Sequence, residues 1–171
     1  MALPRVLKYL NLFNDGNNWL GIVESFTQPK LTRKFEKYRG GGMSGAADID
    51  MGLDDGALEA EWQIGGMEPL IYKQLGTVKA DGVPLRFTAS IQRDDTGEVW
   101  AVEIALRGRH KEIDSGEYKQ GEKPTTKIST VCTYYKLTVN GEVLVEIDLL
   151  NMIENIGGED RLEEHRAAIG L

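Results

Sequence analysis

Hydrophobic and polar residues alternate with a period of two over several runs of the sequence, the pattern of strands that bury one face. The clearest run spans residues 83–92, VPLRFTASIQ. Its apolar positions would share one face: Val83, Leu85, Phe87, Ala89 and Ile91. After the turn RDDTGE, the run VWAVEIALRG puts four more apolar side chains on one face: Trp100, Val102, Ile104 and Leu106. The two runs predict an antiparallel hairpin with one packed face.

A second hairpin is predicted where ISTVCTYYKLTV is followed by Asn140-Gly141 and then by EVLVEID. Asn-Gly between alternating runs favours a type I′ turn, because both central residues need a positive φ. The first run would present one apolar face, made of Val131, Tyr135, Leu137 and Val139.

Weaker patterns predict the remaining elements. Residues 7–26 suggest a hairpin around Asn14-Asp15-Gly16, and ALEAEWQIG suggests a strand that carries Leu58 and Trp62. MEPLIYKQLG predicts a short helix with Pro69 in its first turn and Gly76 as its stop.

The end of the chain, GGEDRLEEHRAAIG, predicts a second helix with Glu159 and Asp160 near its start and Gly170 after its last turn. Leu162 and Ile169 lie seven residues apart and would form one thin apolar stripe, so this helix should dock on another surface. No repeat or linker divides the sequence. We therefore expect one domain over residues 1–171, mainly β, with an antiparallel sandwich or barrel-like fold and one or two short helices.

Composition narrows the class of protein. The formal net charge of -7 argues against an electrostatic grip on DNA or RNA. The only cysteine, Cys132, lies in an apolar β-type run, which predicts a buried structural thiol and folding in a reducing compartment. No run approaches the ~20 apolar residues of a membrane helix, and the first residues lack the apolar core of a signal peptide, so we expect no membrane anchor.

The segment RGGGMSG matches the dinucleotide pattern G-x-G-x-x-G through Gly40, Gly42 and Gly45. A dinucleotide-binding turn needs a buried strand before it and a helix after it. The preceding KLTRKFEKY is too charged for such a strand, and the following AADIDMGLDDG has no helical period. The segment also lacks the lysine and hydroxyl residue of a phosphate-binding loop after Gly45. We therefore interpret residues 39–56 as a long glycine-rich connection between strands.

No other pattern predicts a catalytic, cofactor or metal site. A calcium loop that begins at Asp50 would put Gly52 at a ligand position and Asp55 where glycine is required. His110 lies among Arg107, Arg109 and Lys111, which suggests a surface residue in a basic patch, and His165 lies on the terminal helix. The tryptophans are expected to pack in the core: Trp19, Trp62 and Trp100. We expect a protein that is not an enzyme.

Six segments, taken together and in order, resemble a known family. They are LNLFNDGNNWLGIVESFTQPKLTRKFEKYRGGGM, IDMGLDDG, QRDDTGE, RGRHKEIDSGEYKQGE, TYYKLTVNGEVLVEID and NMIENIGGEDRLEEHRAAIGL. The sequence from about Leu3 to Leu171 is similar to the major tail tube protein of contractile-tailed bacteriophages, a family that includes the tube subunits of phage-tail-like bacteriocins. The region MEPLIYKQLGTVKADG is the least typical part.

The resemblance implies a structural virion protein that forms hexameric rings, stacked into a hollow tube inside a contractile sheath. It implies that strands of neighbouring subunits line the lumen, that an extended loop reaches the adjacent ring, and that the tube conducts DNA into the host. The implied partners are other copies of the chain, the tail sheath protein, and the tape-measure, baseplate and terminator proteins. DNA would pass without specific binding, no cofactor is implied, and assembly would take place in the bacterial host cytoplasm.

The residues fit this implication, since a hairpin-rich domain leaves sheet edges that another chain can pair with. We expect the glycine-rich loop to stack the rings, through Arg39, Gly40, Gly41, Gly42, Met43, Ser44 and Gly45. Because a basic lumen would hold DNA, we expect an acidic or neutral channel, with Asp48, Asp50, Asp54, Glu59 and Glu61 as candidates. The alternative is a monomeric β-sandwich that binds a sugar or peptide. It would need clustered exposed aromatics, whereas alternation sends the adjacent Tyr134 and Tyr135 to opposite faces.

Overall fold

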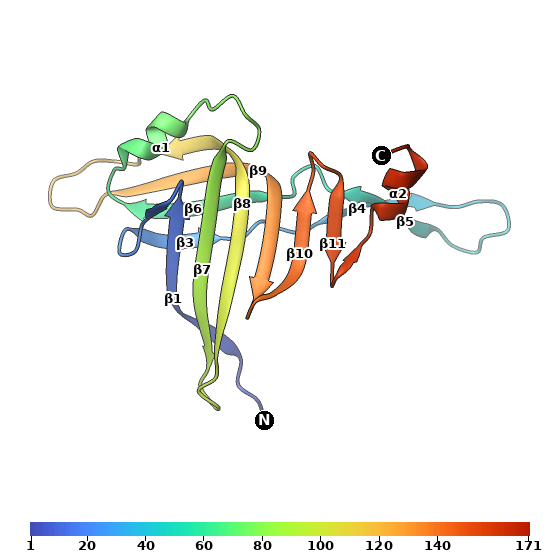
Figure 1. Cartoon of the computed structure of the whole chain (residues 1–171), viewed down its shortest axis with the longest axis horizontal. Helices are drawn as coiled ribbons and strands as arrows, with labels where there is room; N and C mark the ends of the chain where they lie inside the picture. The colour runs from blue at the N-terminus through green and yellow to red at the C-terminus, as the bar shows by residue number, and fades with distance from the viewer.

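Antiparallel strands make up most of the computed structural model, which describes residues 1–171 (Figure 1). This confirms the mainly β prediction with two short helices. The elements in chain order are β1 (Arg5–Asn14), β2 (Asn17–Asn18), β3 (Val23–Thr27), β4 (Arg33–Tyr38), β5 (Ala47–Leu53), β6 (Glu59–Gly65), α1 (Pro69–Gln74), β7 (Val83–Arg93), β8 (Val99–Asp114), β9 (Thr125–Val139), β10 (Glu142–Asp148), β11 (Ile153–Ile156), β12 (Glu159–Asp160) and α2 (Glu163–Ala168).

Two long strands, β8 and β9, belong to two sheets at once. The first half of β8 and the last half of β9 lie within the main sheet, whose order is β12-β11-β10-β9-β8-β7-β1-β2. The first half of β9 also pairs with β6, and β6 pairs with β3. The small sheet is therefore made of β3, β6, the first half of β9 and the last part of β8. The core lies between the two sheets, in the orthogonal arrangement where strands turn the corner from one sheet to the other.

The corner is formed by Gly108 and a β-bulge at Thr133. Arg107 is opposite Tyr134, whereas Gly108 is opposite Cys132, so Thr133 has no partner on β8. A Cβ atom on Gly108 would lie 2.0 Å from the carbonyl oxygen of Val131, so only glycine fits at this crossing.

The bulge also shifts the alternation along β9, so the predicted inward face of Val131 is wrong. Tyr135 is buried as predicted, but Val131, on the other side of the bulge, is 38% exposed. Its neighbours Thr130 and Cys132 are buried instead. Burial raises the pKa of the Cys132 thiol to about 12, which confirms the prediction of an inert structural cysteine.

Side chains on the core face of the main sheet form rows across neighbouring strands, and the rows become less buried toward the β7–β8 turn. The register aligns Leu12, Phe87 and Ile104 in a buried row. Phe87 stacks on Phe26 of β3, with ring centroids 4.2 Å apart, so this row is covered by the small sheet. The next row toward the β7–β8 turn is only half-buried and contains Leu10, Ala89, Val102 and Val139. The main sheet therefore extends beyond its cover.

Several predicted turns and helices are confirmed. Asn140 and Gly141 have φ values of 50° and 82°, as a type I′ turn requires. Pro69 begins α1, and Gly76 follows it with a φ of 83°. The hairpin around Asp15 is much shorter than predicted, because β2 has two residues and the chain then leaves β1 to pair β3 with β6.

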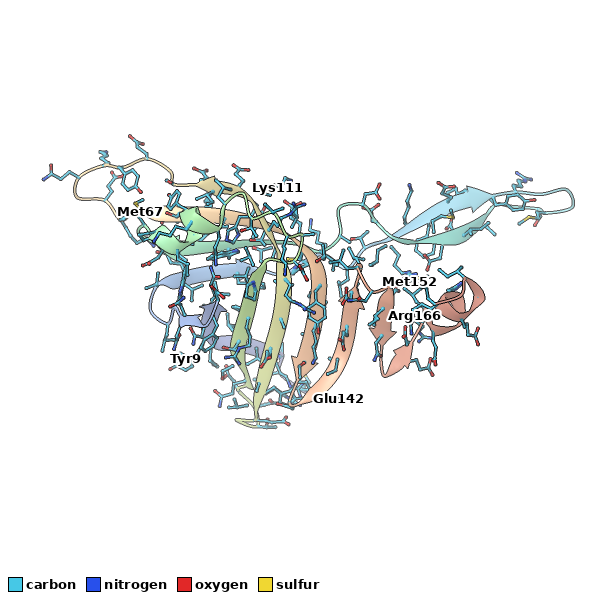
Figure 2. All side chains as sticks on the ribbon, turned by 45° about the horizontal axis from the view of Figure 1, so that its top comes forward. Tyr9, Met67, Lys111, Glu142, Met152 and Arg166 are labelled. Carbon is cyan, nitrogen blue, oxygen red and sulfur yellow. The ribbon has the colours of Figure 1, made fainter.

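The terminal helix begins later than predicted and does not dock on the body. Glu159 and Asp160 form β12, and α2 starts only at Glu163. None of its residues is buried, so the expected apolar contact is not made within the chain. Arg166 holds the helix instead, through the carbonyl oxygen of Met152 at 2.7 Å and the carboxylate of Asp160 at 2.6 Å (Figure 2).

His110 is buried, and the prediction of a surface histidine in a basic patch is wrong. Alternation along β8 points Arg109 and Lys111 outward and His110 inward. Its ring Nε2 lies 3.0 Å from the Gln74 side-chain oxygen, an acceptor, so Nε2 carries the proton. Nδ1 then accepts from the Thr130 hydroxyl at 3.0 Å, and that hydroxyl oxygen accepts from Trp62 at 3.1 Å. This network of satisfied bonds needs a neutral imidazole, and burial lowers the pKa of His110 to about 4.

Replacing Gly108 with alanine should destabilise the fold severely, because the new Cβ would clash with the backbone of β9 rather than with a movable side chain. We expect the free energy of unfolding to fall by more than about 3 kcal/mol. Urea denaturation would measure the change. Gly45→Ala is the matched control, since no atom lies within 4 Å of its added Cβ and its φ is not positive. A Gly108→Ala protein as stable as this control would contradict the role given to the corner.

Stability should fall as the pH drops through the ordinary pKa of histidine, because the unfolded chain then binds a proton that folded His110 excludes. Between pH 7.5 and pH 5, His110 should lower the free energy of unfolding by about 2 kcal/mol. Chemical denaturation across this range would test it. The decrease should persist in His165→Gln, which changes an exposed histidine, and should largely disappear in His110→Gln.

Candidate assembly surfaces

β4 and β5 form a two-stranded sheet of their own that projects from the body, here called the arm (Figure 1). The predicted connection over residues 39–56 is therefore wrong in extent: only residues 39–46 link the strands, and Ala47–Leu53 is a strand. The pattern of residues 48–51, Asp-Ile-Asp-Met, does alternate. This run has no buried face, because both faces of the arm are exposed to solvent. Its pattern therefore differs from that of the strands that bury one face.

The two faces of the arm differ in chemistry. The register places the ion pairs on one face, the charged face, with Lys37 and Asp48 3.4 Å apart and Arg33 and Asp50 2.5 Å apart. Phe35, opposite Asp50 and 57% exposed, is the one large apolar side chain on this face. The opposite face carries an apolar stripe, defined as Tyr38, Ala47, Ile49 and Met51, and the charged side chains on this face are Lys34 and Glu36 of β4. Tyr38, Ile49 and Met51 are 58%, 46% and 56% exposed. Exposed apolar side chains gathered on a projecting hairpin are typical of interaction surfaces, so the stripe is a candidate contact surface.

The tip of the arm, Arg39 to Ala46, is a folded turn. The Arg39 guanidinium donates to the carbonyl oxygens of Met43 and Ser44, at 3.3 and 3.2 Å. Gly42 has a φ of 86°, a conformation that favours glycine. The G-x-G-x-x-G match thus joins two antiparallel strands, without the strand-to-helix geometry of a dinucleotide site.

The five predicted lumen carboxylates do not lie together. Asp48 and Asp50 are on the arm, Asp54 follows it, and Glu59 and Glu61 are on β6 of the small sheet. Lysine or arginine pairs with three of them: Asp48 with Lys37, Asp50 with Arg33, and Glu59 with Lys111. Arg33 and the Gly52 N–H lower the pKa of Asp50. Glu61 belongs instead to the outer face of the small sheet, where its row across β9 reaches Glu112 and the next row contains Lys127.

The outer edge of β1 is unpaired over most of its length. β1 pairs with β7 from Arg5 to Asn14, but its other edge meets only the two residues of β2. Exposed apolar side chains follow this free edge: Val6, Leu7 and Tyr9. Such an edge is a template for a strand of another chain.

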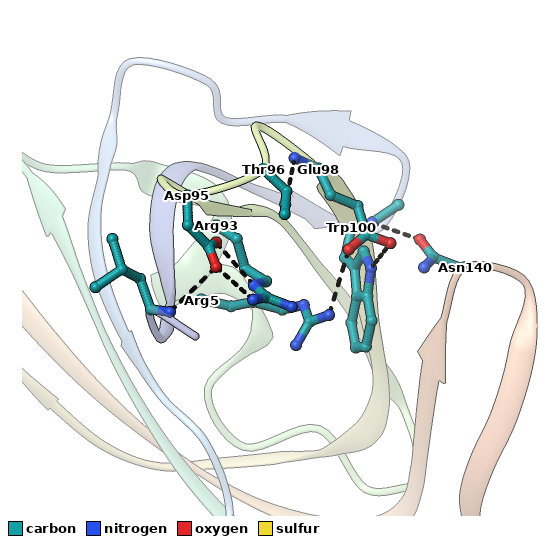
Figure 3. A network of polar contacts seen from close by, with 9 residues as sticks. Arg5, Arg93, Asp95, Thr96, Glu98, Trp100 and Asn140 are labelled. Atoms are coloured by element: carbon teal, nitrogen blue, oxygen red, sulfur yellow. Dashed lines mark hydrogen bonds and ion pairs between the residues drawn. The ribbon is translucent and has the colours of Figure 1, made fainter. Parts of the chain in front are cut away.

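A polar network fixes this end of β1 (Figure 3). The Arg5 guanidinium lies 3.5 Å from the centre of the Trp100 ring and pairs with Glu98 at 3.4 Å. Trp100 is thus half-exposed, with the Arg5 guanidinium stacked on its ring. The prediction that Trp100 packs in the core is wrong. Its indole N–H donates to Glu98 at 2.8 Å and is the main cause of that carboxyl's lowered pKa. Nearby, Arg93 lowers the pKa of Asp95 by hydrogen bonding.

The exposed area supports a subunit rather than a compact monomer. A compact monomer of 19.0 kDa exposes about 8,400 Å², whereas this chain exposes 10914 Å². The arm, the free β1 edge and the uncovered end of the main sheet account for this shape. No group of three His, Cys, Asp or Glu side chains could hold a metal ion, and no helix is long and apolar enough to cross a membrane.

The fold and its projecting surfaces define an all-β architectural subunit. Residues 4–170 match the family described as phage tail tube protein FII, and the chain belongs to this family. It is 56% identical over 172 residues to the tail tube protein of Escherichia phage P2, with all of both chains covered. It is 45% identical over 173 residues to the major tail tube protein of Serratia phage KSP20, covering 100% of this chain and 99% of that one.

A solved structure supports the fold independently. A chain in the six-fold symmetrised baseplate of the anti-feeding prophage superimposes with a TM-score of 0.56 at 10% identity. The match covers 81% of this chain and 97% of that one. These relatives place the chain among structural tail tube proteins, not enzymes, and confirm the family predicted from the sequence.

Proposed function

We propose that this chain forms hexameric rings that stack into the inner tube of a contractile tail, the conduit through which DNA enters the host cell. The observation that carries the proposal is the arm, whose apolar stripe is not covered by any part of its own chain. Ring closure and stacking both use unlike surfaces of neighbouring copies, and a stacking contact that does not close produces a filament. The free β1 edge supplies one such surface and the arm another.

The arm is assigned to the contact between stacked rings. The predicted stacking residues Arg39 to Gly45 form its tip, and we now add the stripe Tyr38, Ile49 and Met51 as the part that supplies buried apolar area. The sheath, tape-measure, baseplate and terminator proteins are the proposed partners of the completed tube, and assembly is proposed to occur in the host cytoplasm.

Polar substitution of the stripe should block polymerisation and leave the subunit folded, because Ile49 and Met51 are exposed in the isolated chain. We expect rods in negative-stain micrographs of the unchanged protein and no rods from Ile49→Ser/Met51→Ser. Val78→Ser, at a 92% exposed position outside the arm, is the matched control and should form rods. Circular dichroism would show that all three proteins fold. Persistent small particles from the unchanged protein would instead favour the monomeric sugar- or peptide-binding domain.

We propose that the lumen is acidic or neutral, so that it does not retain DNA. Among the candidates, Asp48, Asp50 and Glu59 are already paired with cations, whereas Glu61 has no cationic partner and shares its row across β9 with Glu112. Asp54 is retained as a candidate at the base of the arm.

Lysines at Glu61 and Glu112 should make assembled tubes retain labelled linear DNA, and raising the salt concentration should release it. Co-sedimentation of DNA with the tubes at several salt concentrations would measure this. A single lysine at Glu142, in the β9–β10 turn, is the control for added charge elsewhere. Tubes of the double variant that retain no more DNA than the control would remove Glu61 from the proposed lumen.

A further inference from the structure

The arm is joined to the body by very few contacts. The backbones of its two strands form hydrogen bonds only with each other. Leu53, at its base, packs on the edge of the core. One polar contact reaches the body: the Arg33 guanidinium binds the carboxylate of Glu154 in β11. No other hydrogen bond or ion pair connects β4 or β5 with the rest of the chain.

Arg33 holds both partners at once. Its Nε donates to Asp50 of β5 at 2.5 Å, and a terminal nitrogen of the same guanidinium donates to Glu154. The planar fork of arginine suits such a bridge, because it can place parallel donors on two carboxylates. One residue therefore ties both strands of the arm to the same point on the body.

Glu154 is an unusual partner because its side chain is only 8% exposed. The register places it in the core-face row of the main sheet, after Tyr135 and Ile147. The small sheet does not extend to β11, and the contact shown for the carboxylate there is the Arg33 side chain from the base of the arm. A buried carboxylate is costly without a cation, and Arg33 is the only cation paired with it.

We propose that Arg33, bridging Asp50 and Glu154, is a latch that fixes the direction of the arm before the subunit meets its neighbours. The proposal rests on the assembly function above. The latch uses the charged face of the arm, so that face is held toward the body and the apolar stripe is turned away from it, toward a second copy. Arg33 is a positioning residue in this account, because the stripe makes the contact.

A fixed direction strengthens assembly without adding any contact. A free arm reaches the docking direction only part of the time, and its apparent affinity falls by that fraction. If release of the latch left the arm in the docking direction a tenth of the time, the subunit concentration needed for rods would rise about tenfold. The same loss of order would appear in isolated subunits as a wider range of arm positions.

Single-molecule fluorescence energy transfer on the full chain would test the latch at concentrations too low for assembly. Dyes would be attached at Ser44→Cys in the tip and Glu142→Cys in the β9–β10 turn, both exposed. The buried Cys132, with its pKa raised to about 12, should not react in the folded protein. We expect one narrow transfer peak with the latch intact and a broad distribution in Arg33→Met and Glu154→Gln.

Lys37→Met is the matched control, because it removes the other ion pair of the charged face, Lys37–Asp48, which does not touch the body. It should keep the narrow peak and the assembly threshold of the unchanged protein. A narrow, unshifted peak in Arg33→Met would overturn the latch, as would a broad peak with an unchanged threshold for rods. Arg33→Lys should restore part of both properties. Failure of the unchanged protein to form rods would refute the assembly function itself, whatever the arm does.

Discussion

The crossing of β8 and β9 at Gly108 determines how the two sheets are joined and therefore where the core and the exposed surfaces lie. With no side chain at Gly108 and one extra residue at Thr133, two strands bend enough to serve both sheets. The bend folds the small sheet over part of the main sheet and encloses the core. It also leaves the other end of the main sheet, where Ala89 and Val102 are half-buried, without a cover. The subunit therefore has a closed core and, outside it, strands and apolar side chains that no part of the chain covers.

The uncovered parts of the subunit include the arm and the free β1 edge, where apolar and charged side chains occupy different places. Apolar side chains lie where the chain has no partner of its own: along β1 and on β4–β5, where all but Phe35 share one face. Charged side chains lie where the arm meets the body, through Arg33, Asp50 and Glu154. In the proposed assembly this division separates two tasks: the ion pairs fix the direction of the arm with little net stabilisation, and apolar burial supplies the free energy of association.

Local patterns in the sequence predicted the elements that are fixed by local chemistry. Asn140-Gly141 predicted its turn because positive φ values select those residues, and Pro69 predicted the start of α1 because proline fits a first helical turn. The hairpin β7–β8 followed from one buried face. Family resemblance extended these elements to a function, which composition alone did not indicate.

Features that depend on distant parts of the chain were missed. His110 was misplaced because its basic neighbours in sequence lie on the opposite face of β8, and Val131 because a bulge at Thr133 interrupts the period of two. The predicted loop over residues 39–56 includes β5 because neither face of that strand is buried. The bridge from Arg33 to Glu154 spans 121 positions, and no local pattern indicates it. The apolar members of residues 47–51 were the available signal for the stripe.

Amide hydrogen exchange, compared between dilute subunits and the assembled state, would show whether copies of this chain cover one another's exposed strands and apolar faces. We expect the amides of β1 and of β4–β5 to exchange much more slowly after assembly, while those around His110 in the core change little. Equal exchange in β1 and the arm before and after assembly would contradict it.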